Sequence, residues 1–302
     1  MTSEFAIIDR IRRMLPGPPA GQTWIGDDAA VVPSPAGRLL LSCDAVVAGV
    51  HGDLALMGAD DLGWKAVSTA VSDIAAMGGT PAQILVTVAA PPDTDLDALY
   101  RGIRDAAAAC ECAVVGGDLV NAAVLVVSVA VAGSVDGEPV LRSGARPGDA
   151  VLVTRPIGAS ALGLRLLRSG RPGPGAAVRA YRRPVAEIAA GRAARAAGAT
   201  AMIDISDGLA ADLGHLAEAS GVGLALDSVP VADGATLEDA LHGGEDYALA
   251  FTAPDPAGAG AAFAAAGLPS PAVIGRCTAD PGDRTLSGQP LPAGGFEHRW
   301  EQ

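Results

Sequence analysis

Acidic residues recur along this chain at turns flanked by glycine or serine. They stand at or near the ends of apolar segments, at Asp27, Asp28, Asp44, Asp73, Asp118, Asp204, Asp207 and Glu245. Oxygen ligands without accompanying histidine or cysteine favour a hard cation, and Mg²⁺ is the natural candidate. Several such ions would bind a polyphosphate and relieve the repulsion among the carboxylates. If the side chains converge, they predict a metal-dependent nucleotide site; singly, each also fits an aspartate that stabilises a surface turn.

Asp73 lies among small and apolar neighbours within residues 71–79. Its neighbours recur at three- and four-residue spacing, at Ala66, Thr69, Ala70 and Ala76. In a helix these residues share one face that carries no bulky side chain, so another group can approach closely. The alternative interpretation is a helix packed tightly on a sheet, with Asp73 solvated near the helix end.

Several common catalytic motifs are missing from the sequence. It contains no Gly-x4-Gly-Lys-Ser/Thr phosphate loop, no protein-kinase motif set and no Gly-x-Ser-x-Gly nucleophile elbow. Only four histidines are available for hydrolase chemistry, His51, His215, His242 and His298. We expect the last three at the surface, which leaves the carboxylates as the main chemical feature.

Apolar periodicity and turn residues predict the elements that carry these side chains in the first half. We expect helices over residues 4–15, from Asp60 to Gly78, and over 96–110, with strands over 23–25, 38–43, 84–90, 113–115 and 125–133. This β-α-β-β-α-β-like order suggests a ferredoxin-like α+β half. Acidic turns at strand ends are where ligand groups usually gather.

A domain junction is predicted between residues 136 and 149, where glycine, proline and charged residues concentrate. Beyond it we expect strands over 150–154, 201–205, 223–226 and 248–252, and helices over 160–167, 184–197, 209–220 and 253–267. The sequence therefore predicts an α+β chain of two domains, residues 1–137 and residues 138–302.

Composition limits the classes of function. Half of the 302 residues are apolar, so two sizeable cores are expected. The net charge of −13 argues against nucleic-acid binding, which depends on lysine and arginine. Cys43, Cys110, Cys112 and Cys277 have neither zinc-site spacing nor disulfide density, which favours a cytoplasmic setting. There is no signal-peptide pattern, and the longest apolar run, 122–133, is too short to span a membrane.

Six short motifs follow one another along the chain. They are Gly26-Asp27-Asp28-Ala29-Ala30-Val31, Ser72-Asp73-Ile74-Ala75-Ala76-Met77-Gly78, Gly116-Gly117-Asp118, Arg142-Ser143-Gly144-Ala145-Arg146-Pro147-Gly148-Asp149, Ile203-Asp204-Ile205-Ser206-Asp207-Gly208-Leu209 and Gly243-Gly244-Glu245-Asp246-Tyr247. In this order and at this spacing they resemble the thiamine-monophosphate kinase family. Single pieces are similar to the wider superfamily of aminoimidazole ribonucleotide synthetase. The full ordered set covers most of the chain and is much more specific.

This resemblance implies transfer of the ATP γ-phosphoryl group to thiamine monophosphate, giving thiamine diphosphate. It also implies an aminoimidazole ribonucleotide synthetase-like fold in which the first domain binds ATP and Mg²⁺ and forms a homodimer, while the second completes the phosphate and substrate site. The acceptor is a phosphate oxygen that is already ionised, so alignment and charge neutralisation matter more than a base.

The resemblance also implies residue roles. Mg²⁺ ions would be bound by Asp28, Ser42, Cys43, Asp44, Asp73, Asp118, Asp204 and Asp207, some of them through a backbone atom or a water molecule. ATP would contact Tyr100, Gly117, Asp118, Arg142 and Ser206, and the thiamine moiety would face His51, Glu245 and Phe296. The residues expected to be catalytic are Asp73, Asp118, Arg142 and Asp207. Arg142 can add a planar fork to phosphate oxygens; an ordinary surface ion pair is the alternative.

The chain departs from the family pattern at a few positions. Cys43 replaces the usual threonine, Leu119 a hydroxyl residue, and Gly52 a bulky aromatic, while Arg155-Pro156 replaces a glycine-containing turn. Two further hypotheses therefore stay open: a superfamily member that uses ATP on another small acceptor, and an ATP-binding paralogue with impaired catalysis.

Overall fold

The computed structural model describes residues 4–25, 29–170 and 175–297. The chain divides into two compact units, with Met1–Ile74 and Thr80–Gly137 in unit 1, and Ala75–Gly79 and Glu138–Gln302 in unit 2. Both units combine helices with a β-sheet, and the predicted α+β chain with two halves is confirmed. Among the described residues, no helix has both the length and the apolar character needed to cross a bilayer.

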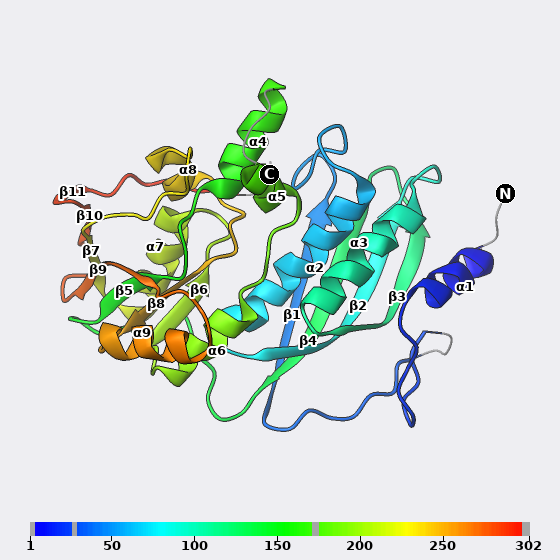
Figure 1. The fold of residues 1–302 in the computed structure, drawn as a ribbon, viewed down its shortest axis with the longest axis horizontal. Coiled ribbons are helices and arrows are strands. Elements are labelled where there is room, and N and C mark those ends of the chain that lie inside the picture. Colours follow the sequence, from blue (N-terminus) through cyan, green and yellow to red (C-terminus); the bar gives the residue numbers. More distant parts are fainter. Residues whose placement is uncertain (1–3, 26–28, 171–174, 298–302) are drawn as a thin grey trace, which may run out of the picture. The chain divides into compact units, whose positions relative to one another are not determined.

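Unit 1 is a four-stranded sheet with helices on one face (Figure 1). Its elements are α1 (Glu4–Met14), β1 (Arg38–Val47), α2 (Ala59–Ala76), β2 (Thr80–Ala90), α3 (Leu96–Ala109), β3 (Ala113–Asn121) and β4 (Val126–Val135). The strand order is β1-β4-β2-β3, in which β4 is antiparallel to both neighbours and β2 is parallel to β3.

The order of elements along unit 1 is β-α-β-α-β-β and differs from the β-α-β-β-α-β order suggested by the sequence. Two parallel neighbouring strands need a crossover, and α3 supplies it between β2 and β3. The predicted strand at 113–115 continues to Asn121, because Gly116 and Gly117 pair with β2. The predicted strand at 23–25 appears as an isolated bridge between Thr23 and Val31.

The two faces of the unit 1 sheet differ in burial. Ile84 and Val86 of β2 and Val127 of β4 are fully buried on the helix-covered face. On the opposite face, alternate residues of β1 are exposed, including Leu39 and Leu41, and Leu41 is 72% exposed. This second surface, with Leu85 of β2, is called the open face below.

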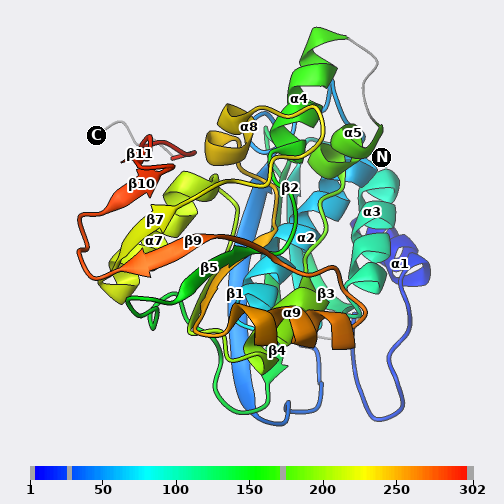
Figure 2. The same cartoon turned by 60° about the vertical axis from the view of Figure 1, so that its left-hand side comes forward.

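Helices α2 and α3 lie side by side over the sheet (Figure 2), and two glycines allow their close approach. A Cβ atom at Gly63 of α2 would collide with the Leu99 carbonyl of α3, and one at Gly102 of α3 would collide with the Asp60 carbonyl of α2. Helix α3 begins at Asp95, whose side chain accepts a hydrogen bond from the Ala98 amide. Backbone contact thus fixes the spacing of the two helices.

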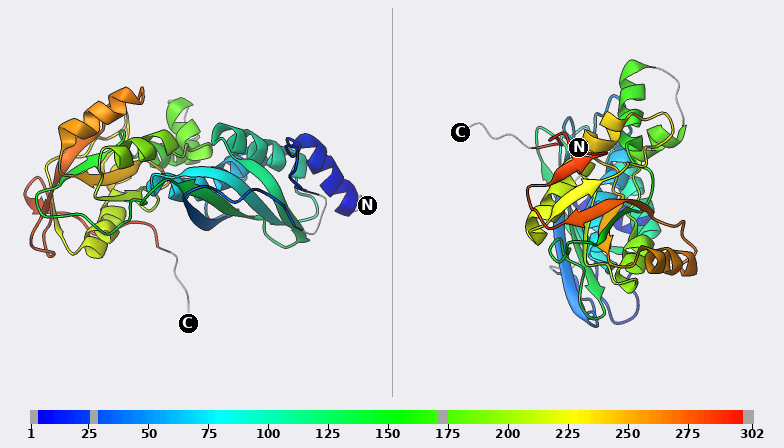
Figure 3. Two further views of the ribbon diagram at one scale, coloured as in Figure 1. Left: turned by 90° about the horizontal axis from the view of Figure 1, so that it is seen from below. Right: turned by 90° about the vertical axis from the view of Figure 1, so that its left-hand side faces the viewer.

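Unit 2 contains a seven-stranded sheet with the order β11-β10-β7-β9-β5-β8-β6. Figure 1 labels these strands, and Figure 3 shows the same ribbon from two further directions. The strands are β5 (Ala150–Val153), β6 (Ala201–Asp204), β7 (Gly223–Leu226), β8 (Leu249–Ala253), β9 (Ala272–Thr278), β10 (Arg284–Leu286) and β11 (Gln289–Pro290). The helices are α4 (Ala159–Ser169), α5 (Gly175–Arg182), α6 (Ile188–Ala196), α7 (Leu209–Ser220), α8 (Leu237–His242) and α9 (Pro256–Ala265).

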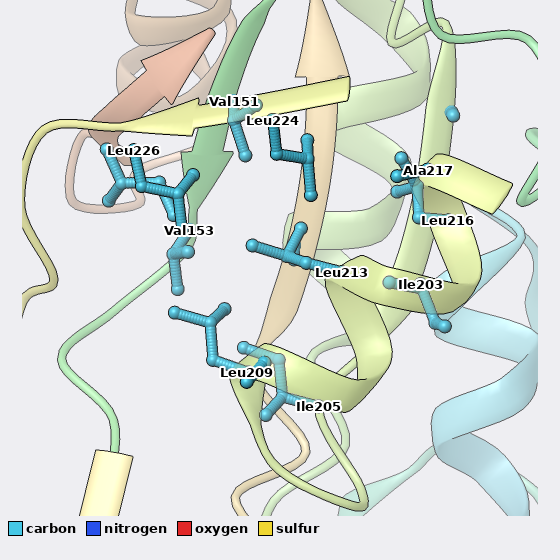
Figure 4. Packing of buried hydrophobic residues seen from close by; sticks show 14 of the residues in the cluster. Val151, Val153, Ile203, Ile205, Leu209, Leu213, Leu216, Ala217, Leu224 and Leu226 are labelled. Atoms are coloured by element: carbon cyan, nitrogen blue, oxygen red, sulfur yellow. The ribbon is translucent and has the colours of Figure 1, made fainter. Parts of the chain in front are cut away.

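Each face of the unit 2 sheet builds its own core. Val151 and Val153 of β5 belong to the core with α7, whereas Leu152 between them belongs to the core with α6 and α9. Leu209 and Leu213 of α7 point toward the strands (Figure 4). Helix α7 follows Gly208 and ends at Ser220, and the next residue, Gly221, has a left-handed backbone with φ 66°. The start of α7 therefore follows directly on the acidic turn 206–208.

Candidate active site

In unit 1, the predicted residues Ser42 and Asp73 meet on the helix-covered side of the sheet. The Ser42 hydroxyl of β1 donates a hydrogen bond to Asp73 Oδ2 of α2. The Cys43 side chain is exposed on the open face, where its sulfur lies 3.6 Å from Ser128 Oγ. A role for residue 43 near Asp73 would therefore use its backbone.

Gly117 and Asp118 lie in the middle of β3, next to β2. A Cβ at Gly117 would collide with the Val86 carbonyl, so the two backbones approach closely. The Asp118 carboxylate accepts a hydrogen bond from the Leu119 amide at 2.9 Å. Burial raises the pKa of Tyr100, and the negative charge of Asp118 raises it further, so the phenol stays protonated and can donate a hydrogen bond.

His51 is held by the backbone of Val47 and by a buried lysine. Its Nδ1 accepts a hydrogen bond from the Val47 amide at 3.1 Å, and Lys65 Nζ donates to its carbonyl at 2.8 Å. Lys65 has no exposed surface. Gly52 packs tightly: a Cβ there would lie 2.5 Å from Leu62 Cδ1, so a larger residue would need the neighbouring side chains to move. Lys65 is not among the site residues predicted from the sequence.

In unit 2, three separate segments meet at the turn of residues 206–208. The Ser206 carbonyl accepts a hydrogen bond from the Glu245 amide at 2.7 Å, and the Asp207 carbonyl accepts one from the Phe296 amide at 3.0 Å. The structure thus brings together Ser206, Asp207, Glu245 and Phe296, four of the site residues predicted from the sequence. Glu245 has a left-handed backbone with φ 56°, a strained conformation that is common at functional sites.

The same turn concentrates negative charge. Burial raises the pKa of Asp212 to about 8, and the charges of Asp207 and Asp204 contribute to the increase. Asp204 is itself buried at the end of β6. Carboxylate oxygens are the ligands that a hard divalent cation such as Mg²⁺ prefers.

Asp246 stabilises the turn at the start of α4. Its Oδ2 accepts a hydrogen bond from the Gly158 amide at 2.6 Å and its Oδ1 one from the Ser160 amide at 3.3 Å. Arg155 donates to the Asp246 carbonyl and bonds Glu187 Oε1 at 2.6 Å. Burial raises the pKa of Asp246, while these amides and Arg155 oppose the increase. The departure at Arg155-Pro156 therefore belongs to a structural network around Asp246.

Arg142 lies on an exposed segment that is tied to the end of α7. Ser220 Oγ donates to the Arg142 carbonyl and accepts from the amides of Gly144 and Ala145, each at 3.1 Å. The segment is thus held through backbone hydrogen bonds, while Arg142 itself is exposed.

The predicted metal ligands are distributed over both units. Unit 1 carries Ser42, Cys43, Asp44, Asp73 and Asp118, and unit 2 carries Asp204 and Asp207. Asp28 lies outside the described residues. Within the described ranges, no three His, Cys, Asp or Glu side chains gather into a group that could hold a metal ion.

Comparison with known proteins identifies the two halves of the chain. The family "AIR synthase related protein, N-terminal domain" matches residues 26–135, and "AIR synthase related protein, C-terminal domain" matches residues 146–286. The fold is thus that of an AIR synthase related protein. A thiamine-monophosphate kinase of Mycobacterium tuberculosis is 40% identical to this chain over 274 residues. The match covers 84% of this chain and 82% of that protein. The chain belongs to the thiamine-monophosphate kinase family, and the predicted resemblance is confirmed.

Further relatives agree with this assignment. The Bacillus subtilis thiamine-monophosphate kinase is 37% identical over 248 residues, or 76% of each protein. The crystal structure of thiamine-monophosphate kinase from Stenotrophomonas maltophilia K279a has a TM-score of 0.83 at 32% identity and covers 96% of this chain and 98% of its own. The structure "AaThiL complexed with AMPPCP and TMP" has a TM-score of 0.77 at 32% identity. The match covers 98% of this chain and 97% of that chain.

Proposed function

We propose that this protein transfers the γ-phosphoryl group of ATP to thiamine monophosphate and so forms thiamine diphosphate. The observation that carries the proposal is its similarity, over nearly the whole of both chains, to AaThiL complexed with AMPPCP and TMP. The acceptor oxygen is ionised at neutral pH, so the protein needs to align two anions and to neutralise charge as the phosphoryl group moves.

We propose that Mg²⁺ ions bind to Asp28, Ser42, Cys43, Asp44, Asp73, Asp118, Asp204 and Asp207. The other seven side chains offer only oxygen ligands, which supports this proposal, and Cys43 would act through its backbone carbonyl. When bound, the ions supply positive charge to the transferring phosphoryl group. The Ser42 hydroxyl orients Asp73 through its hydrogen bond, and the turn that carries Asp207 is fixed by the Phe296 amide.

ATP is proposed to contact Tyr100, Gly117, Asp118, Arg142 and Ser206. The Tyr100 phenol, which its raised pKa keeps protonated, is a suitable hydrogen-bond donor to such a ligand. Arg142 presents a planar fork to phosphate oxygens. The catalytic residues on this proposal are Asp73, Asp118, Arg142 and Asp207, because they touch the reacting phosphates or their cations.

The thiamine moiety is proposed to face His51, Glu245 and Phe296. The buried ammonium of Lys65 fixes the backbone at His51. The backbones of Glu245 and Phe296 are bound to the turn that bears Ser206 and Asp207. These contacts support recognition of the acceptor by segments whose positions are set by backbone hydrogen bonds.

We further propose a homodimer formed through the open face of unit 1, and a cytoplasmic location. Leu39, Leu41 and Leu85 are large apolar side chains exposed on one sheet surface. Exposed apolar patches on a sheet commonly mark protein interfaces. The reduced cysteines, which are free throughout the described chain, agree with a cytoplasmic setting.

The test is formation of thiamine diphosphate from purified protein, ATP, MgCl₂ and thiamine monophosphate, followed by chromatography. We expect product with Mg²⁺, none with EDTA, and a loss of at least about 100-fold in kcat for Asp73→Asn. Asp105→Asn, on the exposed side of α3, is the matched control and should keep wild-type activity. Nucleotide binding by calorimetry without product, or turnover of another acceptor in its place, would overturn the proposal.

A further inference from the structure

Asp212 binds three consecutive backbone amides with one oxygen. Its Oδ2 accepts hydrogen bonds from the amides of Ser206, Asp207 and Gly208, each at 3.1 Å. The Asp212 side chain is only 2% exposed. Burying a carboxyl group is costly unless its oxygens are hydrogen-bonded, and this arrangement supplies three donors to one atom.

These hydrogen bonds hold the turn that precedes α7. A usual helix cap accepts from amides inside the first turn of the helix. Here the N-cap is Gly208, which offers no side chain, and Asp212 reaches back from inside α7 to the cap residue and to the two residues before it. The conformation stabilised by Asp212 is therefore that of residues 206–208.

The turn is held from both sides. Its amides point to Asp212, whereas the carbonyls of Ser206 and Asp207 accept from the amides of Glu245 and Phe296. A change in the amide orientation at 206–208 also reorients these carbonyls, because each peptide unit is planar. Asp212 thus acts on two further segments that it does not itself contact through a side chain.

We propose that Asp212 is a positioning residue for phosphoryl transfer, one that sets the Ser206-Asp207 turn and, through it, the backbones at Glu245 and Phe296. The proposal rests on the proposed function of this site. Asp212 needs no contact with ATP, a cation or the acceptor in this role. Small misplacements of reacting groups are enough to cost about 100-fold in rate.

The experiment compares Asp212→Ala and Asp212→Asn in the full chain. Alanine removes the acceptor, whereas asparagine keeps a carbonyl oxygen that can receive the same three amides. We expect Asp212→Ala to lose about 100-fold in kcat, with smaller changes in KM, and Asp212→Asn to stay within about tenfold of wild type at an unchanged Mg²⁺ requirement. Hydrogen exchange at residues 206–208 should become faster in the alanine variant alone.

Asp255→Ala is the matched control, because Asp255 also accepts from two backbone amides, those of Ala257 and Gly258, but at the start of α9. It should leave kcat unchanged. The proposal is overturned if Asp212→Ala keeps kcat within threefold of wild type, or if exchange at 206–208 does not change. It is also overturned if Asp212→Asn raises the Mg²⁺ requirement, which would mark a direct ligand.

Two readouts separate this proposal from the function on which it rests. If Asp212→Ala does not fold, the kcat and Mg²⁺ requirement of Asp212→Asn still decide between a positioning residue and a ligand. A wild-type protein that forms no thiamine diphosphate overturns the proposed function and, with it, the positioning role of Asp212 in phosphoryl transfer. Protection of the three amides in that protein would still be measured by exchange and would report on the turn itself.

Discussion

The Asp246→Ala substitution removes the carboxylate that joins the Glu245 segment to the start of α4. In the folded protein this side chain is 2% exposed and accepts from the buried amides of Gly158 and Ser160. The contact from Arg155 uses the Asp246 carbonyl and is kept in the variant. The substitution therefore isolates the contribution of two hydrogen bonds to one carboxylate.

The expected loss follows from the two donors left without an acceptor. An unsatisfied buried donor costs about 1–3 kcal/mol. Removing the carboxylate also removes its own burial cost, which is visible in the raised pKa of Asp246, so the net loss is smaller than the sum. We expect unfolding to become easier by about 2–4 kcal/mol, which for a domain of this size lowers the midpoint by roughly 5–15 °C.

Differential scanning calorimetry or thermal circular dichroism measures the change. Asp246→Asn keeps one carbonyl oxygen toward Gly158 and should lose about half as much. Asp280→Ala removes an exposed carboxylate that accepts from the Gly282 amide in a surface turn, and it should change stability by less than about 0.5 kcal/mol. A midpoint for Asp246→Ala within 2 °C of wild type would show that the buried amides find other acceptors, and the reasoning would fail.

Three further predictions concern other parts of the chain. Leu41→Asp places a charge on the open face and should convert the proposed dimer to a monomer in light scattering; an unchanged mass would contradict that interface. Lys65→Met removes the donor to the His51 carbonyl and should raise KM for thiamine monophosphate about tenfold, whereas an unchanged KM would separate His51 from the acceptor. The folded pKa of Asp212, about 8, exceeds its ordinary value of 3.8, so without divalent cations the unfolding free energy should fall by on the order of 5 kcal/mol between pH 4 and 8. Urea titrations of wild type and Asp212→Asn measure this loss, and equal pH dependence in both would refute it.

The family and the segments of the candidate site could be predicted because each motif is a short stretch of neighbouring residues that can be recognised without its distant partners. Asp207 and Glu245 were chosen from neighbouring glycines, and the structure links their segments through one backbone hydrogen bond. The length of β3 could not be predicted in this way. Glycines are uncommon inside strands, so Gly116 and Gly117 indicated a strand end, whereas the close approach of β2 requires glycine at 117.

The supporting residues were harder to predict, because their roles depend on distant partners. Lys65 reads as one polar residue on a helix, yet its ammonium reaches the carbonyl of His51. Asp246 follows a proposed substrate residue in sequence, but its side chain bonds residues near position 158. Asp212 gave one local signal, a carboxylate four residues after a glycine that offers no side chain to cap the helix.

The crossing of α2 and α3 has a consequence for how the gene can vary. Gly63 and Gly102 each face a main-chain carbonyl of the other helix. Every missense change of a glycine codon introduces a Cβ atom, and no substitution elsewhere removes a main-chain oxygen. No second mutation can therefore compensate for a substitution of either glycine. Since α2 carries Asp73 and α3 carries Tyr100, a deep mutational scan should find these two codons as intolerant as those of the proposed site residues themselves.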